Sequence, residues 1–279
     1  MPNDNKNDNK FAVLIDADNI SDKYIKIILD EISNDGVATY KRIYGDWTKP
    51  ALASWKNVLL DYSILPIQQY NYTSGKNSTD SSMIIDAMDI LYSGQVNGFC
   101  LVSSDSDFTR LAARLRESGM IIVGMGERKT PKPFISACNR FKYLDILATA
   151  EPAAQAAPAK LPASKEPCKA RPAAAVQTAR RDTVPGPSSV PESVLKEDMT
   201  NLETIKQAIQ TIAAENSDED DWMFIGTIGN LLVKRYPDFD VRNFGFSKLT
   251  PFIESLGLFD IKSVRTQDSG VKLIYVKPK

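Results

Sequence analysis

The sequence predicts an α/β fold in residues 1–150, a disordered linker over 151–198, and a small winged-helix-like α+β domain over 199–279. The first segment alternates short apolar runs with stretches whose apolar residues recur at helical spacing, which is typical of a parallel sheet flanked by helices. The second changes abruptly in composition. The third shows three helical patterns followed by a hairpin. A chain of 279 residues is long enough for two such cores.

The elements of the first segment follow one another in a β-α-β-α order. The run FAVLI ends at Asp16 and is apolar throughout, as expected of a buried parallel strand. Further strands are expected at 37–45, 63–67, 98–103 and 120–126, and helices at 22–33, 51–60, 81–92 and 108–117. This order predicts a parallel sheet with helices on both faces.

The middle segment differs in composition from both of its neighbours. Fifteen of the 25 residues from 151 to 175 are Ala or Pro, and a polar stretch containing further prolines continues to about residue 197. Proline breaks helices, and alanine buries too little area to offset the entropy lost on ordering. We expect a semi-extended, disordered linker between two folded units.

The last segment predicts helices at 202–215, 225–236 and 248–256. Two candidate strands follow at 258–264 and 271–277, with a turn around 268–270 between them. Three helices followed by a hairpin suggest a winged helix.

Composition excludes several kinds of catalysis. The chain contains no histidine, which excludes Ser-His-Asp and Cys-His catalysis, His-ligated zinc and paired-imidazole RNA cleavage. The formal net charge is −1, so the chain has no global attraction to nucleic acid, and any such binding must come from local patches.

The three cysteines show no C-x-x-C spacing, which argues against a disulfide scaffold or a structural zinc site. The first ten residues, MPNDNKNDNK, lack the apolar core of a signal peptide, and no apolar run approaches the length of a membrane span. We therefore expect a cytoplasmic protein with no membrane partner.

Acidic residues gather where two strands end. Asp16, Asp18 and Asn19 follow the first strand, and Asp105 and Asp107 follow the strand that begins at residue 98. Ligands of open parallel sheets bind at the carboxyl ends of the strands. A third cluster places Asp80 at a helix start, with Asp86 and Asp89 further along.

Converging carboxylates repel one another unless a cation neutralises them. Hard oxygen ligands without His or Cys favour Mg²⁺ or Mn²⁺ over zinc. Each cluster alone has a plainer explanation, because Asp80 or Asp105 could cap a helix and Asp18 could sit in a turn. Three clusters in this order favour a metal site.

Three motifs in residues 11–126 resemble the NYN domains of the LabA-like branch of the PIN superfamily, which are metal-dependent ribonucleases. They are I-D-x-x-N (Asp16, Asn19), K-x-x-x-D-(x)5-D (Lys76, Asp80, Asp86) and L-V-S-x-D-x-D-F (Ser103, Asp105, Asp107, Phe108).

The resemblance implies a PIN-like fold for the first domain. It also implies Asp16, Asp80 and Asp105 as metal-binding carboxylates with Asp107 close behind, and Asn19 as the residue that orients a ligand or water. Cleavage would leave a 5′-phosphate and a 3′-hydroxyl. The family more often has a shorter Lys-to-Asp spacing, with Gly, than GKNSTD provides. Lys76, Arg110 and Arg128 are candidates for gripping the RNA backbone.

Residues 200–279 resemble the OST-HTH or LOTUS domains, most specifically over RYPDFDVRNFGFSKL. The resemblance implies an RNA-binding winged helix with guanine-rich RNA as one ligand class, and some relatives contact protein partners instead. Basic residues and an amide are available for phosphate contacts: Lys234, Arg235, Arg242, Asn243 and Lys248. Aromatic residues of the same segment are expected to pack between helices: Phe239, Phe244 and Phe246.

We weigh three functions. The first is a Mg²⁺- or Mn²⁺-dependent ribonuclease whose C-terminal domain tethers RNA. The second is a non-catalytic RNA-binding adaptor. The third is a phosphatase of the haloacid dehalogenase type, whose D-x-D-x-T motif is approached by Asp16-x-Asp18-x-Ile20 but lacks the threonine. The first is preferred.

Overall fold

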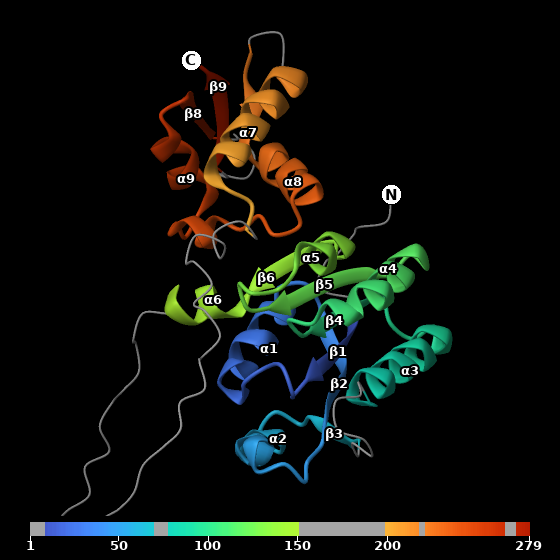
Figure 1. Ribbon diagram of the computed structural model, residues 1–279. Helices are drawn as coiled ribbons and strands as arrows, with labels where there is room; N and C mark the ends of the chain where they lie inside the picture. The colour runs from blue at the N-terminus through green and yellow to red at the C-terminus, as the bar shows by residue number, and fades with distance from the viewer. Residues whose placement is uncertain (1–8, 70–77, 151–198, 218–220, 266–271) are drawn as a thin grey trace, which may run out of the picture.

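The computed structural model describes residues 9–69, 78–150, 199–217, 221–265 and 272–279 (Figure 1). The predicted linker over 151–198 and Lys76 lie outside these residues. None of the helices in the described ranges is long and apolar enough to cross a membrane.

The first domain is built on a six-stranded sheet in which all neighbouring strands run parallel. The strand order is β3-β2-β1-β4-β5-β6. The strands are β1 (Lys10–Asp16), β2 (Val37–Gly45), β3 (Leu65–Gln68), β4 (Gly98–Val102), β5 (Ile121–Gly126) and β6 (Arg140–Tyr143). The chain adds β2 and β3 on one side of β1 and then β4, β5 and β6 on the other side. The carboxyl ends of β1 and β4 therefore form the switch point at which such sheets bind ligands.

Helices cover both faces of this sheet (Figure 1). The α-helices are α1 (Ile25–Ser33), α2 (Lys56–Leu59), α3 (Ser78–Ser93), α4 (Thr109–Glu117), α5 (Lys132–Ala137) and α6 (Leu144–Ala150). Side chains alternate along β1: Ala12 and Leu14 join one core with α3, α4 and α5, whereas Val13 and Ile15 join the other with α1 and α6. The predicted three-layer α/β architecture is therefore confirmed.

Several predicted boundaries differ from the structure. The helix expected over 51–60 is a 3₁₀ helix, η3 (Pro50–Trp55), followed by the single turn of α2. Residue Ser63, expected to start a strand, has φ +52°, so β3 begins two residues later at Leu65. The sequence also did not indicate α5, β6 or α6, which follow the last predicted strand.

The C-terminal domain packs three helices against a small antiparallel sheet of order β7-β9-β8. Its elements are α7 (Leu202–Asn216), β7 (Met223–Phe224), α8 (Ile225–Arg235), η6 (Val241–Phe244), α9 (Leu249–Leu256), β8 (Phe259–Arg265) and β9 (Lys272–Pro278). Phe239 is buried, and Phe244 and Phe246 pack against Phe252 with ring centroids 5.2 and 5.6 Å away. The predicted packing role of these aromatic residues is confirmed.

Candidate active site

Asp16 ends β1 and is fully buried at the switch point. Its Oδ2 accepts hydrogen bonds from the Ser103 hydroxyl (2.8 Å) and the Asn19 amide (2.6 Å), and its Oδ1 accepts one from the Asp18 backbone N–H (3.1 Å). Burial raises the pKa of Asp16, while these donors act in the opposite direction. The three donors come from two strand ends, so the Asp16 carboxylate ties the β1 loop to the β4 loop.

The loop after β4 presents Asp105 and Asp107. The Ser103 hydroxyl accepts a hydrogen bond from the Asp105 backbone N–H (3.1 Å), and Asp105 Oδ1 accepts one from the Asp107 backbone N–H (2.9 Å). Asp105 thus caps the 3₁₀ helix η4 (Ser106–Phe108), while the buried ring of Phe108 anchors that helix in the core. The hydrogen bond from Asp107 N–H occupies one oxygen of the Asp105 carboxylate and fixes the orientation of that group.

Asp80, Asp105 and Asp107 form one group. Each offers a carboxylate oxygen that lies within 4.8 Å of those of the other two. Asp80 comes from the first turn of α3, and the other two come from the β4 loop. Burial raises the pKa of Asp80, and the negative charges of Asp16, Asp105 and Asp107 add to the effect, giving about 6.

This donor set fits a divalent cation. Three carboxylates at this spacing repel one another in the absence of a positive charge. Burial first, and then the neighbouring negative charges, raise the pKa of Asp80. The ligands are all hard oxygen atoms, as Mg²⁺ and Mn²⁺ prefer. Asp16 lies outside the group of mutually close oxygens, although its charge acts on Asp80.

A glycine supports the loop from the adjacent strand. A Cβ atom on Gly126, the last residue of β5, would lie 2.7 Å from the Ser103 carbonyl oxygen and 2.6 Å from the Thr130 hydroxyl. The Ser103 carbonyl and the buried Thr130 side chain cannot move away to make room for a Cβ atom, so this position requires glycine. Ser103 is a motif residue to which the sequence assigned no role, and the sequence did not single out Ser104 or Gly126. Two serines directly after a buried strand are the signal that points to the serines.

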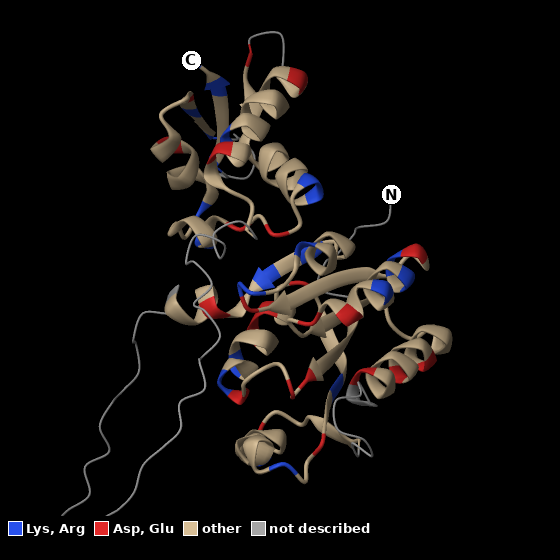
Figure 2. Ribbon diagram, in the orientation of Figure 1, with Lys and Arg blue, Asp and Glu red and all other residues tan. Residues whose placement is uncertain are grey.

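Other acidic residues near the motifs form ion pairs with basic side chains. Asp86, six residues further along α3 than Asp80, pairs with Arg42 and accepts a hydrogen bond from the Tyr44 hydroxyl. Asp18 pairs with Lys49 at 2.9 Å. Acidic positions along α3 are visible in Figure 2. The structure therefore brings together only some of the carboxylates that the motifs contain.

Two basic candidates of the first domain, Arg110 and Arg128, lie on the segments that follow β4 and β5. Arg110 is exposed in the first turn of α4, just after the η4 helix. Arg128 is exposed and lies 3.4 Å from Asp145. A hollow of about 320 Å³ adjoins Asp16 on the β1-loop side, and its lining includes Asn19, Trp55, Glu127 and Lys129.

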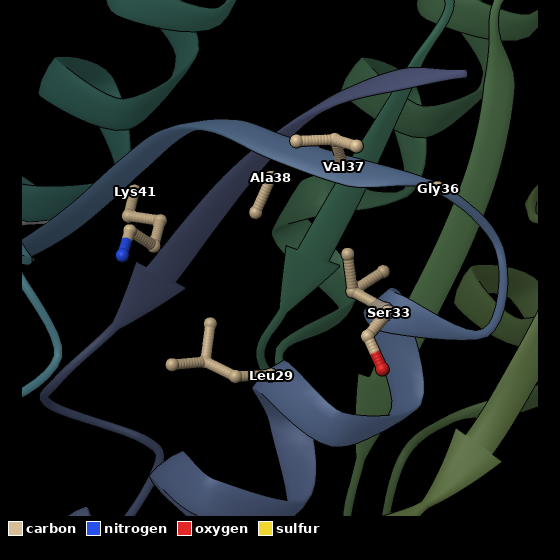
Figure 3. A pocket seen from close by; sticks show the side chains of 7 residues that line it. Leu29, Ser33, Gly36, Val37, Ala38 and Lys41 are labelled. Atoms are coloured by element: carbon tan, nitrogen blue, oxygen red, sulfur yellow. The ribbon is translucent and has the colours of Figure 1, made fainter. Parts of the chain in front are cut away.

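A larger hollow of about 480 Å³ has a different character (Figure 3). It lies between α1 and the start of β2, and Leu29, Val37 and Ala38 are among the residues that line it. Lys41 is its charged member, and none of the clustered aspartates lines it. It is therefore not part of the candidate site.

The basic candidates of the C-terminal domain fall into two groups. Lys234, Arg235 and Lys248 are exposed, and Arg235 lies 3.3 Å from Glu215. Arg242 and Asn243 are half-buried and engaged within the protein: Arg242 pairs with Glu31 and Asp240, and the Asn243 amide donates to the Asp238 carbonyl at 2.8 Å. The structure thus separates two residues that the sequence grouped with the other RNA candidates.

Similarity to known proteins and families covers both domains. A crystal structure of a protein of unknown function from Vibrio parahaemolyticus is similar at 20% identity and a TM-score of 0.41, over 50% of this chain and 94% of that one. No curated protein matches the chain. The family model of the NYN domain matches residues 10–145, and that of the OST-HTH/LOTUS domain matches residues 200–269.

These two matches lie in the order that the motifs indicated, and together they support a nuclease and RNA-binding role. The chain therefore carries an NYN domain followed by an OST-HTH/LOTUS domain.

Proposed function

We propose that this chain is a metal-dependent ribonuclease that hydrolyses phosphodiester bonds of RNA at the Asp80, Asp105 and Asp107 group. The observation that carries the proposal is the convergence of these three carboxylates at the switch point of an NYN domain. In this proposal the three residues hold Mg²⁺ or Mn²⁺, with Asp16 as a further candidate ligand beneath them. A divalent cation there would lower the pKa of a bound water and offset charge on the phosphate.

The chain's own residues hold this site in shape. Ser103 and Asn19 fix the Asp16 carboxylate, and the Ser103 hydroxyl also receives the Asp105 backbone N–H. Exposed cations on the segments that follow β4 and β5, Arg110 and Arg128, would contact the phosphates that flank the cleaved bond. The product would carry a 5′-phosphate, and the LOTUS domain would retain the RNA, with guanine-rich RNA as one class to examine.

The phosphatase alternative fits these contacts poorly. Its nucleophile would be Asp16, but that side chain is fully buried and both of its oxygens accept hydrogen bonds. The adaptor alternative shares every contact with the ribonuclease and is separated from it by activity alone.

We propose the cytoplasm as the location, because Cys100 and Cys138 are buried free thiols, as a reducing compartment allows.

The experiment compares the wild-type protein with Asp105→Asn on labelled RNA in Mn²⁺, Mg²⁺ or EDTA. Asn keeps the size of the side chain but removes a charge from the group, so we expect cleavage to fall at least about 100-fold. Asp89→Asn is the matched control, because it removes an exposed carboxylate of α3 outside the group. Equal degradation by the wild type and Asp105→Asn would indicate a contaminant and defeat the proposal.

A further inference from the structure

The NYN and LOTUS domains meet along β6, the last strand of the parallel sheet (Figure 1). An edge strand presents backbone groups that its own sheet leaves unpaired. Here the backbone N–H of Phe141 donates to the carbonyl oxygen of Pro237, at 2.7 Å. The LOTUS segment that follows α8 therefore satisfies a hydrogen-bonding group of the NYN sheet edge.

A buried carboxylate lies beside this backbone contact. Asp238 is 4% exposed, and its Oδ2 accepts hydrogen bonds from the Tyr143 hydroxyl (3.2 Å) and the Thr200 backbone N–H (2.9 Å). Its Oδ1 accepts one from the Thr200 hydroxyl (2.7 Å). Tyr143 ends β6 and is itself 1% exposed. Buried polar groups are stable only when paired, and Asp238 has a partner in each domain.

A network of four charged residues closes the contact. Glu31 of α1 pairs with Lys142 of β6 and with Arg242 of the LOTUS domain, whose Nη2 also lies 2.6 Å from Asp240. Two positive and two negative groups balance one another. Burial on its own raises the pKa of Glu31, but Arg242 and Lys142 outweigh it and hold that pKa at about 2. Figure 2 shows basic positions on β6, the strand nearest to the LOTUS domain.

We propose that the LOTUS surface formed by Pro237, Asp238 and Arg242 is a docking surface for the β6 edge of its own NYN domain and is not an RNA-binding surface. Both anionic partners of Arg242, Glu31 and Asp240, lie within the protein. We therefore assign RNA retention to exposed cations of the domain, among them Lys234, Arg235 and Lys248. The two domains then form one unit in spite of the long segment between them. The part that concerns RNA rests on the proposed function, whereas the docking itself does not.

The docking is tested in the full chain with a protease site inserted between residues 151 and 198. After cleavage, we expect the two halves to elute together in gel filtration at micromolar concentration. Arg242→Glu should separate them, because it places a third carboxylate against Glu31 and Asp240. A far-UV circular dichroism spectrum of the uncut variant that matches the wild type rules out simple misfolding.

Lys248→Ala is the matched control for the exposed cations, and its halves should stay together. Separation of the wild-type halves at every concentration, or co-elution of the Arg242→Glu halves, would overturn the docking.

Affinity for a labelled guanine-rich RNA oligonucleotide, measured in EDTA on the uncut chain, tests the division of labour. We expect Arg242→Ala to change the dissociation constant less than twofold, and Lys234→Ala with Lys248→Ala to raise it at least tenfold. A tenfold loss in Arg242→Ala, with its halves still associated, would assign Arg242 to RNA and overturn this part. Failure of every protein to bind RNA would overturn the RNA part and the proposed LOTUS role, but it would leave the co-elution result standing.

Discussion

Replacing Asp80 with asparagine is expected to abolish metal-dependent RNA cleavage and, at the same time, to stabilise the metal-free protein. Asp80 is the member of the group whose pKa is raised to about 6, by burial and by the charges of Asp16, Asp105 and Asp107. Its ionised form is therefore unfavourable in the fold unless a cation is bound. Asparagine removes that charge and a metal ligand together, so function and stability change in opposite directions.

The pH dependence of this effect has a definite sign. A carboxyl whose pKa is raised on folding destabilises the fold above that pKa, and the penalty disappears as pH falls toward the ordinary value of 3.8. The difference between a pKa of 3.8 and one of about 6 corresponds to roughly 3 kcal/mol, and solvent screening at this half-buried position reduces it to about 1 kcal/mol. We expect Asp80→Asn to exceed the wild type in stability by that amount at pH 7.5 and to match it near pH 4.

Urea unfolding of the NYN domain in EDTA measures this difference, and titration calorimetry with Mn²⁺ measures the lost metal binding. Asp89→Asn, on the same helix but outside the group, should change neither. A loss of stability in Asp80→Asn in EDTA would contradict the argument. It would show that the Asp80 carboxylate serves the start of α3 as a helix cap and that its repulsion with Asp105 and Asp107 is minor.

The central part of the sheet could be predicted because the sequences of its buried parallel strands are uninterrupted apolar runs. FAVLI and GFCLV become β1 and β4, whose residues are almost wholly buried. The strand β6 could not be recognised in this way, since its sequence R-F-K-Y carries two cations. In the structure, Arg140 pairs with Asp35 and Lys142 pairs with Glu31, so partners distant in sequence make these cations compatible with a strand.

The candidate site, like the fold, could be predicted only in part. Strand ends placed Asp16 and Asp105 near one another, because carboxyl ends of parallel strands share one edge of the sheet. Sequence reasoning could not show that Asp16 is enclosed by three donors, or that Arg242 pairs with Glu31, 211 positions away. Both facts depend on which side chains the tertiary fold brings together.

Substituting Asp16 with alanine is expected to lower the free energy of unfolding of the NYN domain by about 3 kcal/mol. The Ser103 hydroxyl, the Asn19 amide and the Asp18 backbone N–H all lose their acceptor, in a place where Asp16 itself is fully buried. Asp105→Ala is the matched comparison. It removes one cap hydrogen bond, to Asp107 N–H, and should cost about 1 kcal/mol. Urea unfolding in EDTA compares the two without any contribution from metal.

The difference decides how activity losses at the site are to be interpreted. If Asp16→Ala is the less stable protein, its loss of cleavage follows from a collapsed β1–β4 junction as readily as from a lost ligand. Asp80 and Asp105, whose removal leaves that junction intact, then become the informative positions for metal binding. Equal stability of Asp16→Ala and Asp105→Ala would contradict the anchoring role. It would leave Asp16 to act through its charge on Asp80, as a member of the metal-binding set in its own right.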